Sequence, residues 1–306
     1  MNNRASSLFT SKKHKVEIMK KFTTDAHFHI GQAHLTGGTV CQDYALSGIC
    51  GTAAYAVVSD GCSTGGNTDV GARILALATA KAICEYWHTR QLISCETTPL
   101  EIGVHQQVIL SGARDMLGLV QSDMLATCLF ACVCLGGGLV HVKGDGVVAH
   151  TLTNGSLRMI RFEWANNAPL YPPYGSDHYA EFVRFHGGDL TATKLTKEVW
   201  EYDADGAFTK IGSEDISLGA GIRGVTIPVE TSQLDCVAVF SDGVTQVDGM
   251  DWKDVVVDLL AFKMKAGRFA ARRMARVIKE VQKIGKGPLD DIAYAVVLGE
   301  SMSEEE

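Results

Sequence analysis

Two matched segments of the sequence end in the same triplet, Ser-Asp-Gly, directly after a short apolar run. In residues 54–61 the triplet holds Asp60, and in residues 236–243 it holds Asp242. Each apolar run predicts a buried strand, and the glycine that follows permits a sharp turn that leaves a backbone carbonyl accessible. One Asp-Gly pair after a strand usually forms only a turn. Two copies after matched strands favour a shared chemical task for the two carboxylates.

Two more aspartates occupy the ends of predicted strands. Asp145 follows residues 139–143 within Gly-Asp-Gly, and Asp290 precedes the apolar run 292–298 together with Asp291. A sheet that brings these strand ends together also brings the carboxylates together, and clustered carboxylates repel unless a cation or a proton neutralises them. Hard oxygen ligands suit Mg²⁺ or Mn²⁺. The pattern therefore predicts a two-metal hydrolase. For Asp145 the alternative is that it only shapes a turn between two strands.

Other polar residues are weaker candidates for metal binding. Asp69 follows a polar, glycine-rich segment at the expected start of a helix, so helix capping by Thr68 or Asp69 explains it without a metal. His27 and His29 share one face of a predicted strand, where solvent-facing or hydrogen-bonded histidines are more common than ligands. The sequence contains neither a Walker loop nor a His-Glu-x-x-His helix, so P-loop kinases and the common metalloproteases are not expected.

The composition is that of a globular protein with a full core. The chain has 306 residues, of which 46% are hydrophobic and 21% charged, and its net charge of −7 predicts no general affinity for nucleic acids. Nine cysteines without Cys-x-x-Cys spacing predict reduced thiols, no structural zinc and a cytoplasmic protein. No apolar stretch approaches the ~20 residues of a membrane span. The basic residues 1–21 contain no apolar segment of the kind that a secretory signal needs.

The pattern along the chain predicts one catalytic domain over residues 22–300. Residues 1–21 form a basic arm, either a solvated tail or a docking segment, and residues 301–306 form an acidic tail. Residues 163–215 are rich in proline and tyrosine and predict an irregular, flap-like insertion. The regular elements are a hairpin of 44–46 and 52–59 after a glycine-bearing loop at 33–43, a meander over 125–162 with a turn at Asn154-Gly155, and helices at about 68–88, 100–120, 251–263 and 268–284.

Taken in order, the motifs resemble those of the metal-dependent type 2C protein serine/threonine phosphatases. The resemblance runs from about residue 34 to residue 298, and its details are most similar to a bacterial branch of the family. Each motif is short and weak alone, whereas their order and their strand contexts make the set specific. The motifs are Gly-Gly-Thr-Val-Cys-Gln-Asp43, Val-Val-Ser-Asp60-Gly61, Asp69-Val-Gly71-Ala72, Leu-Ala-Thr127, Gly-Asp145-Gly, Phe-Ser-Asp242-Gly243 and Leu-Asp290-Asp-Ile.

The resemblance implies an α+β fold, a four-layer α-β-β-α sandwich of two mainly antiparallel sheets flanked by helix pairs. It also implies that Asp60 bridges two Mn²⁺ or Mg²⁺ ions, with the carbonyl of the following Gly61 beside one of them. Asp242 and Asp290 would complete the shell of the other ion. Asp43 would hold metal-bound water, and Asp145 matches the position of a weaker third ion. The irregular insertion would be the flap beside the active site.

The implied activity is hydrolysis of phosphoserine and phosphothreonine in proteins by water that two metal ions activate, without a covalent enzyme intermediate. The implied partners are a phosphorylated protein substrate and an opposing serine/threonine kinase. Two alternatives stay open. One is a signalling module that binds a partner through a phosphatase fold with little turnover, and the other is a hydrolase of small phosphate esters.

Two positions depart from the family pattern. Gly38 occupies the place of an arginine that grips the substrate phosphate in many members, and His34 is the nearest candidate substitute. Cys62 occupies the place of a histidine that serves many eukaryotic members as general acid. Because a thiol with a pKa near 8.5 is a poor acid for this step, water is expected to protonate the leaving group.

Overall fold

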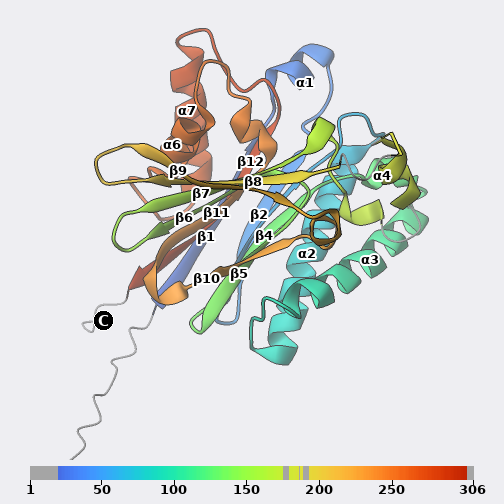
Figure 1. The fold of residues 1–306 in the computed structure, drawn as a ribbon, viewed down its shortest axis with the longest axis horizontal. Coiled ribbons are helices and arrows are strands. Elements are labelled where there is room, and N and C mark those ends of the chain that lie inside the picture. Colours follow the sequence, from blue (N-terminus) through green and yellow to red (C-terminus); the bar gives the residue numbers. More distant parts are fainter. Residues whose placement is uncertain (1–19, 175–178, 186, 189–192, 302–306) are drawn as a thin grey trace, which may run out of the picture.

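Two antiparallel β-sheets pack face to face between two pairs of helices in the computed structural model of the protein (Figure 1). The structure describes residues 20–174, 179–185, 187–188 and 193–301, so the predicted basic arm lies almost wholly outside the described residues, as does most of the acidic tail. The layers run helix, sheet, sheet, helix, which confirms the predicted α+β sandwich. Among the described helices, none combines the length and the apolar composition that a bilayer crossing requires.

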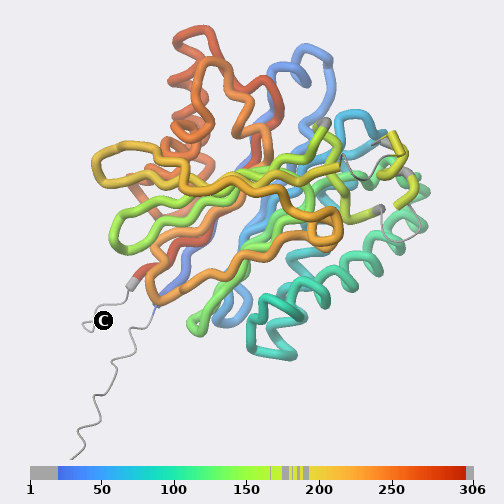
Figure 2. Tube along the Cα trace, in the orientation of Figure 1, coloured from blue at the N-terminus to red at the C-terminus, as the bar shows by residue number. Residues whose placement is uncertain are grey.

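The larger sheet has seven strands in the order β1-β12-β11-β6-β7-β8-β9. Its first and last strands in sequence, β1 and β12, pair antiparallel over their whole length and lie side by side as blue and red tubes in Figure 2. The strand bounds are β1 Lys20–His29, β6 Gly146–Leu152, β7 Leu157–Trp164, β8 Leu195–Tyr202, β9 Phe208–Ile216, β11 Leu234–Phe240 and β12 Ile292–Ser301.

The smaller sheet has five strands in the order β10-β5-β4-β3-β2. Strands β2 and β3 form a hairpin that turns at Gly51 and Thr52, so the predicted five-residue connection at 47–51 was too long. Gly51 adopts a positive φ of 60°, which favours glycine at this tight turn. The strand bounds are β2 Asp43–Cys50, β3 Ala53–Asp60, β4 Cys128–Cys134, β5 Gly137–Lys143 and β10 Val225–Val229.

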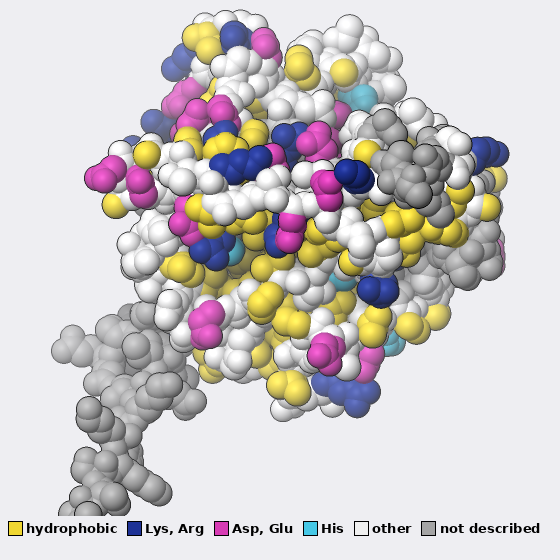
Figure 3. Space-filling model, in the orientation of Figure 1, with side chains coloured by type: hydrophobic (Ala, Val, Ile, Leu, Met, Phe, Trp, Pro, Cys, Tyr) yellow, Lys and Arg dark blue, Asp and Glu magenta, His cyan; other side chains and the backbone are white. Residues whose placement is uncertain are grey.

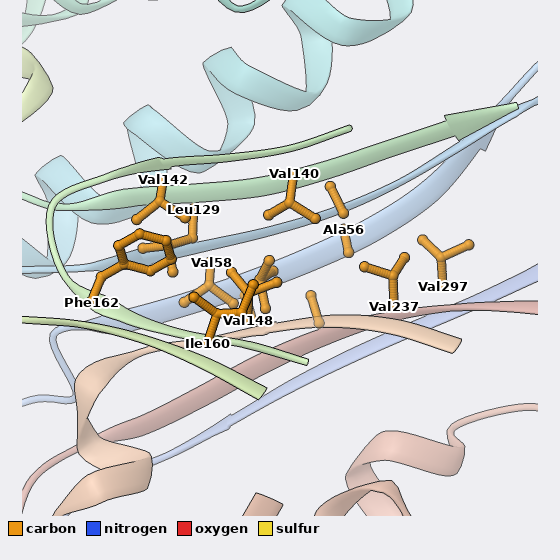
Figure 4. Close-up of a cluster of buried hydrophobic side chains, with 14 of the residues drawn as sticks. Ala56, Val58, Leu129, Val140, Val142, Val148, Ile160, Phe162, Val237 and Val297 are labelled. Carbon is orange, nitrogen blue, oxygen red and sulfur yellow. The ribbon is translucent and has the colours of Figure 1, made fainter. Parts of the chain in front are cut away.

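The main core lies between the two sheets. Side chains at alternate positions of each strand point inward, as the period of a strand requires, and meet those of the facing sheet. Burial of each Val, Leu, Ile or Phe side chain stabilises the fold by about 1.5–3 kcal/mol. Figure 4 shows Val58, Leu129 and Val140 of the five-stranded sheet opposite Val148, Ile160 and Val237 of the seven-stranded sheet.

The helix pairs cover the outer faces of the sheets. Helices α2 (Thr68–Arg90) and α3 (Thr98–Leu117) pack on the five-stranded sheet through a second core that contains Leu75 and Phe130. Helices α6 (Trp252–Leu260) and α7 (Phe269–Gln282) pack on the seven-stranded sheet around residues such as Met274. The central part of each sheet is therefore buried on both faces, which explains why strands such as β4 and β11 are apolar almost throughout.

Several local predictions were wrong. The loop predicted at 33–43 contains helix α1 (Gln32–Gly37). The insertion predicted as irregular over 163–215 contains regular elements, because β8 and β9 extend the larger sheet. Neither Thr68 nor Asp69 caps α2; Asn67 holds the cap position, and the Thr68 hydroxyl donates to the Cys62 carbonyl at 3.1 Å. The remaining helical segments are α4 (Tyr179–Phe185), α5 (Leu218–Arg223) and the 3₁₀ turns η1 (Gln121–Met124), η2 (Ala165–Asn167), η3 (Pro172–Tyr174), η4 (Thr231–Gln233) and η5 (Asp242–Thr245).

Candidate active site

The predicted strand-end aspartates converge at one end of the sandwich. Asp43 begins β2 and pairs directly with Asp60, the last residue of β3. Asp145 lies in the turn between β5 and β6, and Asp242 begins η5 immediately after β11. Asp60, Asp145, Asp242 and Asp290 all line one cleft of about 660 Å³. The structure thus brings together side chains that are up to 230 residues apart in the sequence (290 − 60).

The chain approaches itself closely behind two of these aspartates. A Cβ atom on Gly61 would come within 2.8 Å of the Thr68 carbonyl oxygen, and one on Gly243 would come within 1.7 Å of the Asp291 carbonyl oxygen. Both contacts involve backbone atoms, which cannot move away as a flexible side chain can. The glycines of the two Ser-Asp-Gly triplets are therefore required by close packing of the segments that carry the carboxylates.

Burial dominates the electrostatics of the cluster. It raises the pKa of Asp60 well above its ordinary value, and the carboxylates of Asp43, Asp242 and Asp145 raise it further. The pKa of Asp43 is also raised well above the usual range, chiefly by burial, although a hydrogen bond from Ser241 partly offsets the effect. Burial and neighbouring carboxylates likewise raise the pKa values of Asp145 and Asp242. Such repulsion at a cleft is the signature of a site that takes up cations.

The serines of the two Ser-Asp-Gly triplets form hydrogen bonds that hold the site in place. Both are fully buried. Ser241 donates its hydroxyl to Asp43 Oδ2 at 2.6 Å and accepts the Ala293 N–H at 2.8 Å. Ser59 donates to the Thr127 carbonyl at 2.7 Å. One serine therefore orients a carboxylate directly, whereas the other joins the ends of β3 and β4.

Gln246 connects two of the carboxylates. Its Nε2 atom donates to Asp242 Oδ2 at 3.1 Å and to Asp290 Oδ2 at 3.3 Å. Asp290 also accepts the Asp291 N–H through Oδ1 at 2.8 Å. These bonds hold the carboxylates of Asp242 and Asp290 close to each other.

Asp291 is a structural anchor rather than a wall of the cleft. Its two oxygens accept the main-chain N–H groups of Gly31 at 2.7 Å and Gln42 at 2.6 Å, which ties the segment around α1 to the start of β12. His34 Nδ1 lies 2.8 Å from Asp291 Oδ2. The ligand atoms of His34, Asp290 and Asp291 lie within 4.8 Å of one another, but the Asp291 oxygens are already occupied by main-chain donors.

The cleft has one cationic side chain among the described residues that line it, Arg184 of α4. Cys62 also lines the cleft, whereas His34 does not. The phosphate-binding role predicted for His34 therefore remains a prediction, with Asp291 as the contact that the structure provides. The other lining residues are Gln42, Gly61, Ser63, Thr64, Gly65, Val120, Gln121, Ser122, Leu125, Asn167, Ala168, Pro169, Tyr171 and Phe182.

The donor set fits hard divalent cations. Four carboxylates line the cleft, and such oxygens suit Mg²⁺ and Mn²⁺ rather than metals that prefer sulfur or imidazole. The raised pKa values supply an independent argument, because cations would remove the repulsion that the folded chain sustains at these buried carboxylates. The residues present therefore fit the metal ions that the family resemblance implies.

Comparison with known families decides the assignment. The family model of Protein phosphatase 2C matches residues 30–281. The chain belongs to this family. It is therefore a metal-dependent protein phosphatase, a hydrolase of phosphoric monoesters, as the sequence motifs predicted.

Solved structures of this fold agree. The serine/threonine phosphatase Stp1 of Staphylococcus aureus is 13% identical, with a TM-score of 0.50 over 98% of this chain and 100% of that chain. The PP2C phosphatase domain of SpoIIE from Bacillus subtilis, solved with a fragment of its regulatory domain, is 12% identical, with a TM-score of 0.50 over 94% of this chain and 66% of that chain. At such identity these likenesses show the shared fold alone. The comparison with curated proteins found no match.

Sequence reasoning missed four residues that shape the site. Ser241 carried a visible signal, because serine precedes aspartate in both triplets, and Asp291 lies within the Asp-Asp pair that was noted. Gln246 and Arg184 carried no local signal, since only the folded chain brings them to the carboxylates. Residues 61–65 also spell Gly-Cys-Ser-Thr-Gly, the string of a nucleophile elbow. No histidine lies among the described lining residues to act as base for Ser63.

Proposed function

We propose that this phosphatase removes phosphate from phosphoserine and phosphothreonine side chains of proteins, using two Mn²⁺ or Mg²⁺ ions in the cleft. The observation that carries the proposal is the convergence of four carboxylates on one cavity, where burial and neighbouring carboxylates raise the pKa values of Asp60, Asp145 and Asp242. A binding module without turnover has no need of such costly clustered charges. A cleft of about 660 Å³ also has room for a phosphorylated side chain.

The carboxylates would divide the binding of cations among them. Asp60, between the other groups, would hold both ions, with the Gly61 carbonyl at one of them. Asp242 and Asp290, both held by Gln246, would complete the shell of the other. Asp43, fixed by Ser241, would accept hydrogen bonds from water in the site.

Asp145 is assigned a weaker third ion. Its main support is its position in the wall of the same cleft, with a raised pKa. We expect Asp145→Asn to keep two tight Mn²⁺ sites in calorimetric titration and to lose much of the turnover. Loss of a tight site in that titration would contradict the assignment.

When bound, a pair of divalent ions lowers the pKa of coordinated water and neutralises phosphate oxygens. The chain's own residues do the rest. The buried carboxylates and their hydrogen-bond donors hold the site rigid, and Arg184 supplies a positive charge for a phosphate entering the cleft. Because Cys62 stands where a histidine acid would be needed, the alkoxide leaving group would take its proton from solvent.

The biological setting follows from the family and the surface. The substrate would be a phosphoprotein whose kinase acts on serine or threonine, in the cytoplasm of a bacterium, since the similar structures come from bacteria. On the face shown in Figure 3, basic and acidic side chains are interspersed, without the extended basic patch that nucleic-acid binding requires.

The test is hydrolysis of phosphoserine and phosphothreonine peptides and of p-nitrophenyl phosphate, with Mn²⁺, with Mg²⁺ and with chelator. We expect metal-dependent release of phosphate from the peptides, reduced in Asp60→Asn to the level of the chelated enzyme. Asp248→Asn, an exposed aspartate near the site, should retain wild-type turnover. Activity on the small ester alone would favour the small-ester hydrolase. Metal binding without turnover on any substrate would favour the binding module.

A further inference from the structure

A second cavity, of about 580 Å³, lies on the far side of the five-stranded sheet from the main core. Its floor is the outer face of β4 and β5, where Lys143 lies directly opposite Cys128 and His141 directly opposite Phe130. Helix α3 forms one wall, and the end of α5 forms another. The volume is within the range of about 300–1,000 Å³ that is typical of small-molecule sites.

The lining of this cavity is cationic. Lys143, Arg114 and Arg223 all face it, and no aspartate or glutamate is among its described lining residues, although the protein as a whole carries a net charge of −7. Lys143 is half-buried and makes no ion pair or hydrogen bond with another described residue. Arg223 is exposed and likewise makes no ion pair within the described part of the chain. Arg114 differs, because its Nε atom lies 3.6 Å from the carboxylate of Asp115, which does not line the cavity. Lys143 and Arg223 are therefore the cations without a balancing carboxylate, and such a pair favours a bound anion.

The rest of the lining is apolar or amide. Leu100 and Val104 of α3 line the cavity and are 61% and 66% exposed, so their apolar side chains are accessible to a ligand. Phe130 lines the floor but is only 1% exposed, so Leu100 and Val104 supply the uncovered apolar surface. A simple inorganic ion would leave this apolar surface uncovered, whereas an anion with an aromatic or aliphatic body would cover it.

One side chain joins this cavity to the active-site cleft. Gln121 lines both. Its Oε1 atom accepts from Arg114 Nη1 at 3.2 Å, and its Nε2 atom donates to the Pro173 carbonyl at 2.6 Å. A ligand that draws Arg114 toward itself would thus alter the contacts of a residue in the cleft wall.

We propose that the cavity is a binding site for a small organic phosphate, whose charged end contacts Lys143, Arg223 and Arg114 and whose apolar body lies against Leu100 and Val104. Its occupation acts on the active-site cleft through Gln121, and this second part rests on the proposed phosphatase function.

The binding experiment uses phenylphosphonate, which has no hydrolysable ester bond, in calorimetric titration with excess chelator. Without metal ions the carboxylate cleft repels anions, so the titration reports the second cavity. We expect one site, tighter for phenylphosphonate than for inorganic phosphate, and weakened about tenfold in Arg223→Gln and in Lys143→Met. Arg223 is exposed, so its replacement should leave the fold intact even if Lys143→Met does not.

Two matched arginine replacements serve as controls. Arg276→Gln, on the opposite side of the sandwich, and Arg184→Gln, in the cleft, should bind the probe as the wild type does. The assignment of this site would be overturned if phenylphosphonate did not bind, or if inorganic phosphate bound equally tightly. It would also be overturned if binding were unchanged in Arg223→Gln and weakened in Arg184→Gln.

The coupling is tested separately by turnover of p-nitrophenyl phosphate at saturating Mn²⁺. We expect phenylphosphonate to change kcat in the wild type and in Arg184→Gln but not in Arg223→Gln. A purely competitive effect that persists in Arg223→Gln would place the probe at the metal ions and overturn the coupling. Because the titration needs no turnover, it decides the binding site even if the proposed phosphatase activity fails.

Discussion

Asp43 lies directly opposite Asp60 across the β2–β3 ladder, so the two carboxyl groups emerge from the same face of the sheet into one buried space. Asp43 is only 1% exposed. The hairpin therefore holds two acidic groups together at a cost in stability that cations or protons can remove. This relationship links the stability of the metal-free protein to the chemistry of its site.

The metal-free protein should show this cost in its pH dependence. Burial raises the folded-state pKa values of Asp43 and Asp60 above the unfolded value of about 3.9. Between those values the folded state binds more protons than the unfolded state, so these groups destabilise the fold as pH rises through the raised values. We expect Asp43→Asn to melt above the wild type in chelator at pH 8, with a difference that shrinks as pH falls toward 5.

The informative quantity is the difference in melting temperature between Asp43→Asn and the wild type. Burial lowers the pKa of His141 to about 3 and that of His150 to about 4, so both histidines destabilise the fold in acid, but equally in each protein. Asp248→Asn is the control and should track the wild type. A wild type that melts with or above Asp43→Asn at pH 8 in chelator would contradict the prediction.

Ser241→Ala should weaken metal binding. It removes the 2.6 Å hydrogen bond that orients Asp43, and loss of such supporting bonds typically lowers metal affinity about 10–100-fold. It also leaves the buried Ala293 N–H without its partner, which costs about 1–3 kcal/mol. Titration with Mn²⁺ measures the affinity. Ser59→Ala is the matched control, since Ser59 is equally buried but bonds to a carbonyl; equal Mn²⁺ affinities of the two variants would refute the role of Ser241.

His34→Ala separates two roles for this histidine. The structure places its Nδ1 atom 2.8 Å from Asp291, so we expect the loss to loosen the segment that Asp291 anchors and to lower Mn²⁺ affinity about 10–100-fold. KM at saturating Mn²⁺ should then stay near the wild-type value. Unchanged Mn²⁺ affinity with a raised KM, and a flattened alkaline limb of kcat/KM, would instead support the phosphate contact predicted from the sequence.

Arg184→Gln should impair substrate binding more than chemistry. Arg184 is the cationic side chain among the described residues that line the cleft, and a charge-assisted contact to phosphate is lost with it. We expect KM for a phosphopeptide to rise about tenfold or more, with a smaller change in kcat. Arg158→Gln, which removes an exposed arginine paired with Glu201, is the control. A change in kcat alone would assign Arg184 to the chemical step.

The sequence alone was sufficient to locate the elements that carry the site. Apolar runs closed by Asp-Gly have a strong local cause, because buried strands need β-branched or small apolar residues and sharp turns need glycine. Asp60, Asp145, Asp242 and Asp290 were therefore predicted at strand ends, and the structure has them there. The four longest helices were also predicted, since their apolar spacing is set within the helix itself.

The tertiary structure alone decided which partners these residues meet. Ser241 bonds to Asp43 across 198 residues and Gln246 to Asp290 across 44, and no local pattern reports such pairings. Helix α1 was missed because it is short, buries none of its residues and depends on Gly31 and Gln42 being held by Asp291. Strands β8 and β9 were missed because their side chains are largely half-buried or exposed, β9 being the edge strand and β8 its neighbour, so they lack the apolar run of a central strand. Local composition determined the elements, and packing between distant segments determined the site.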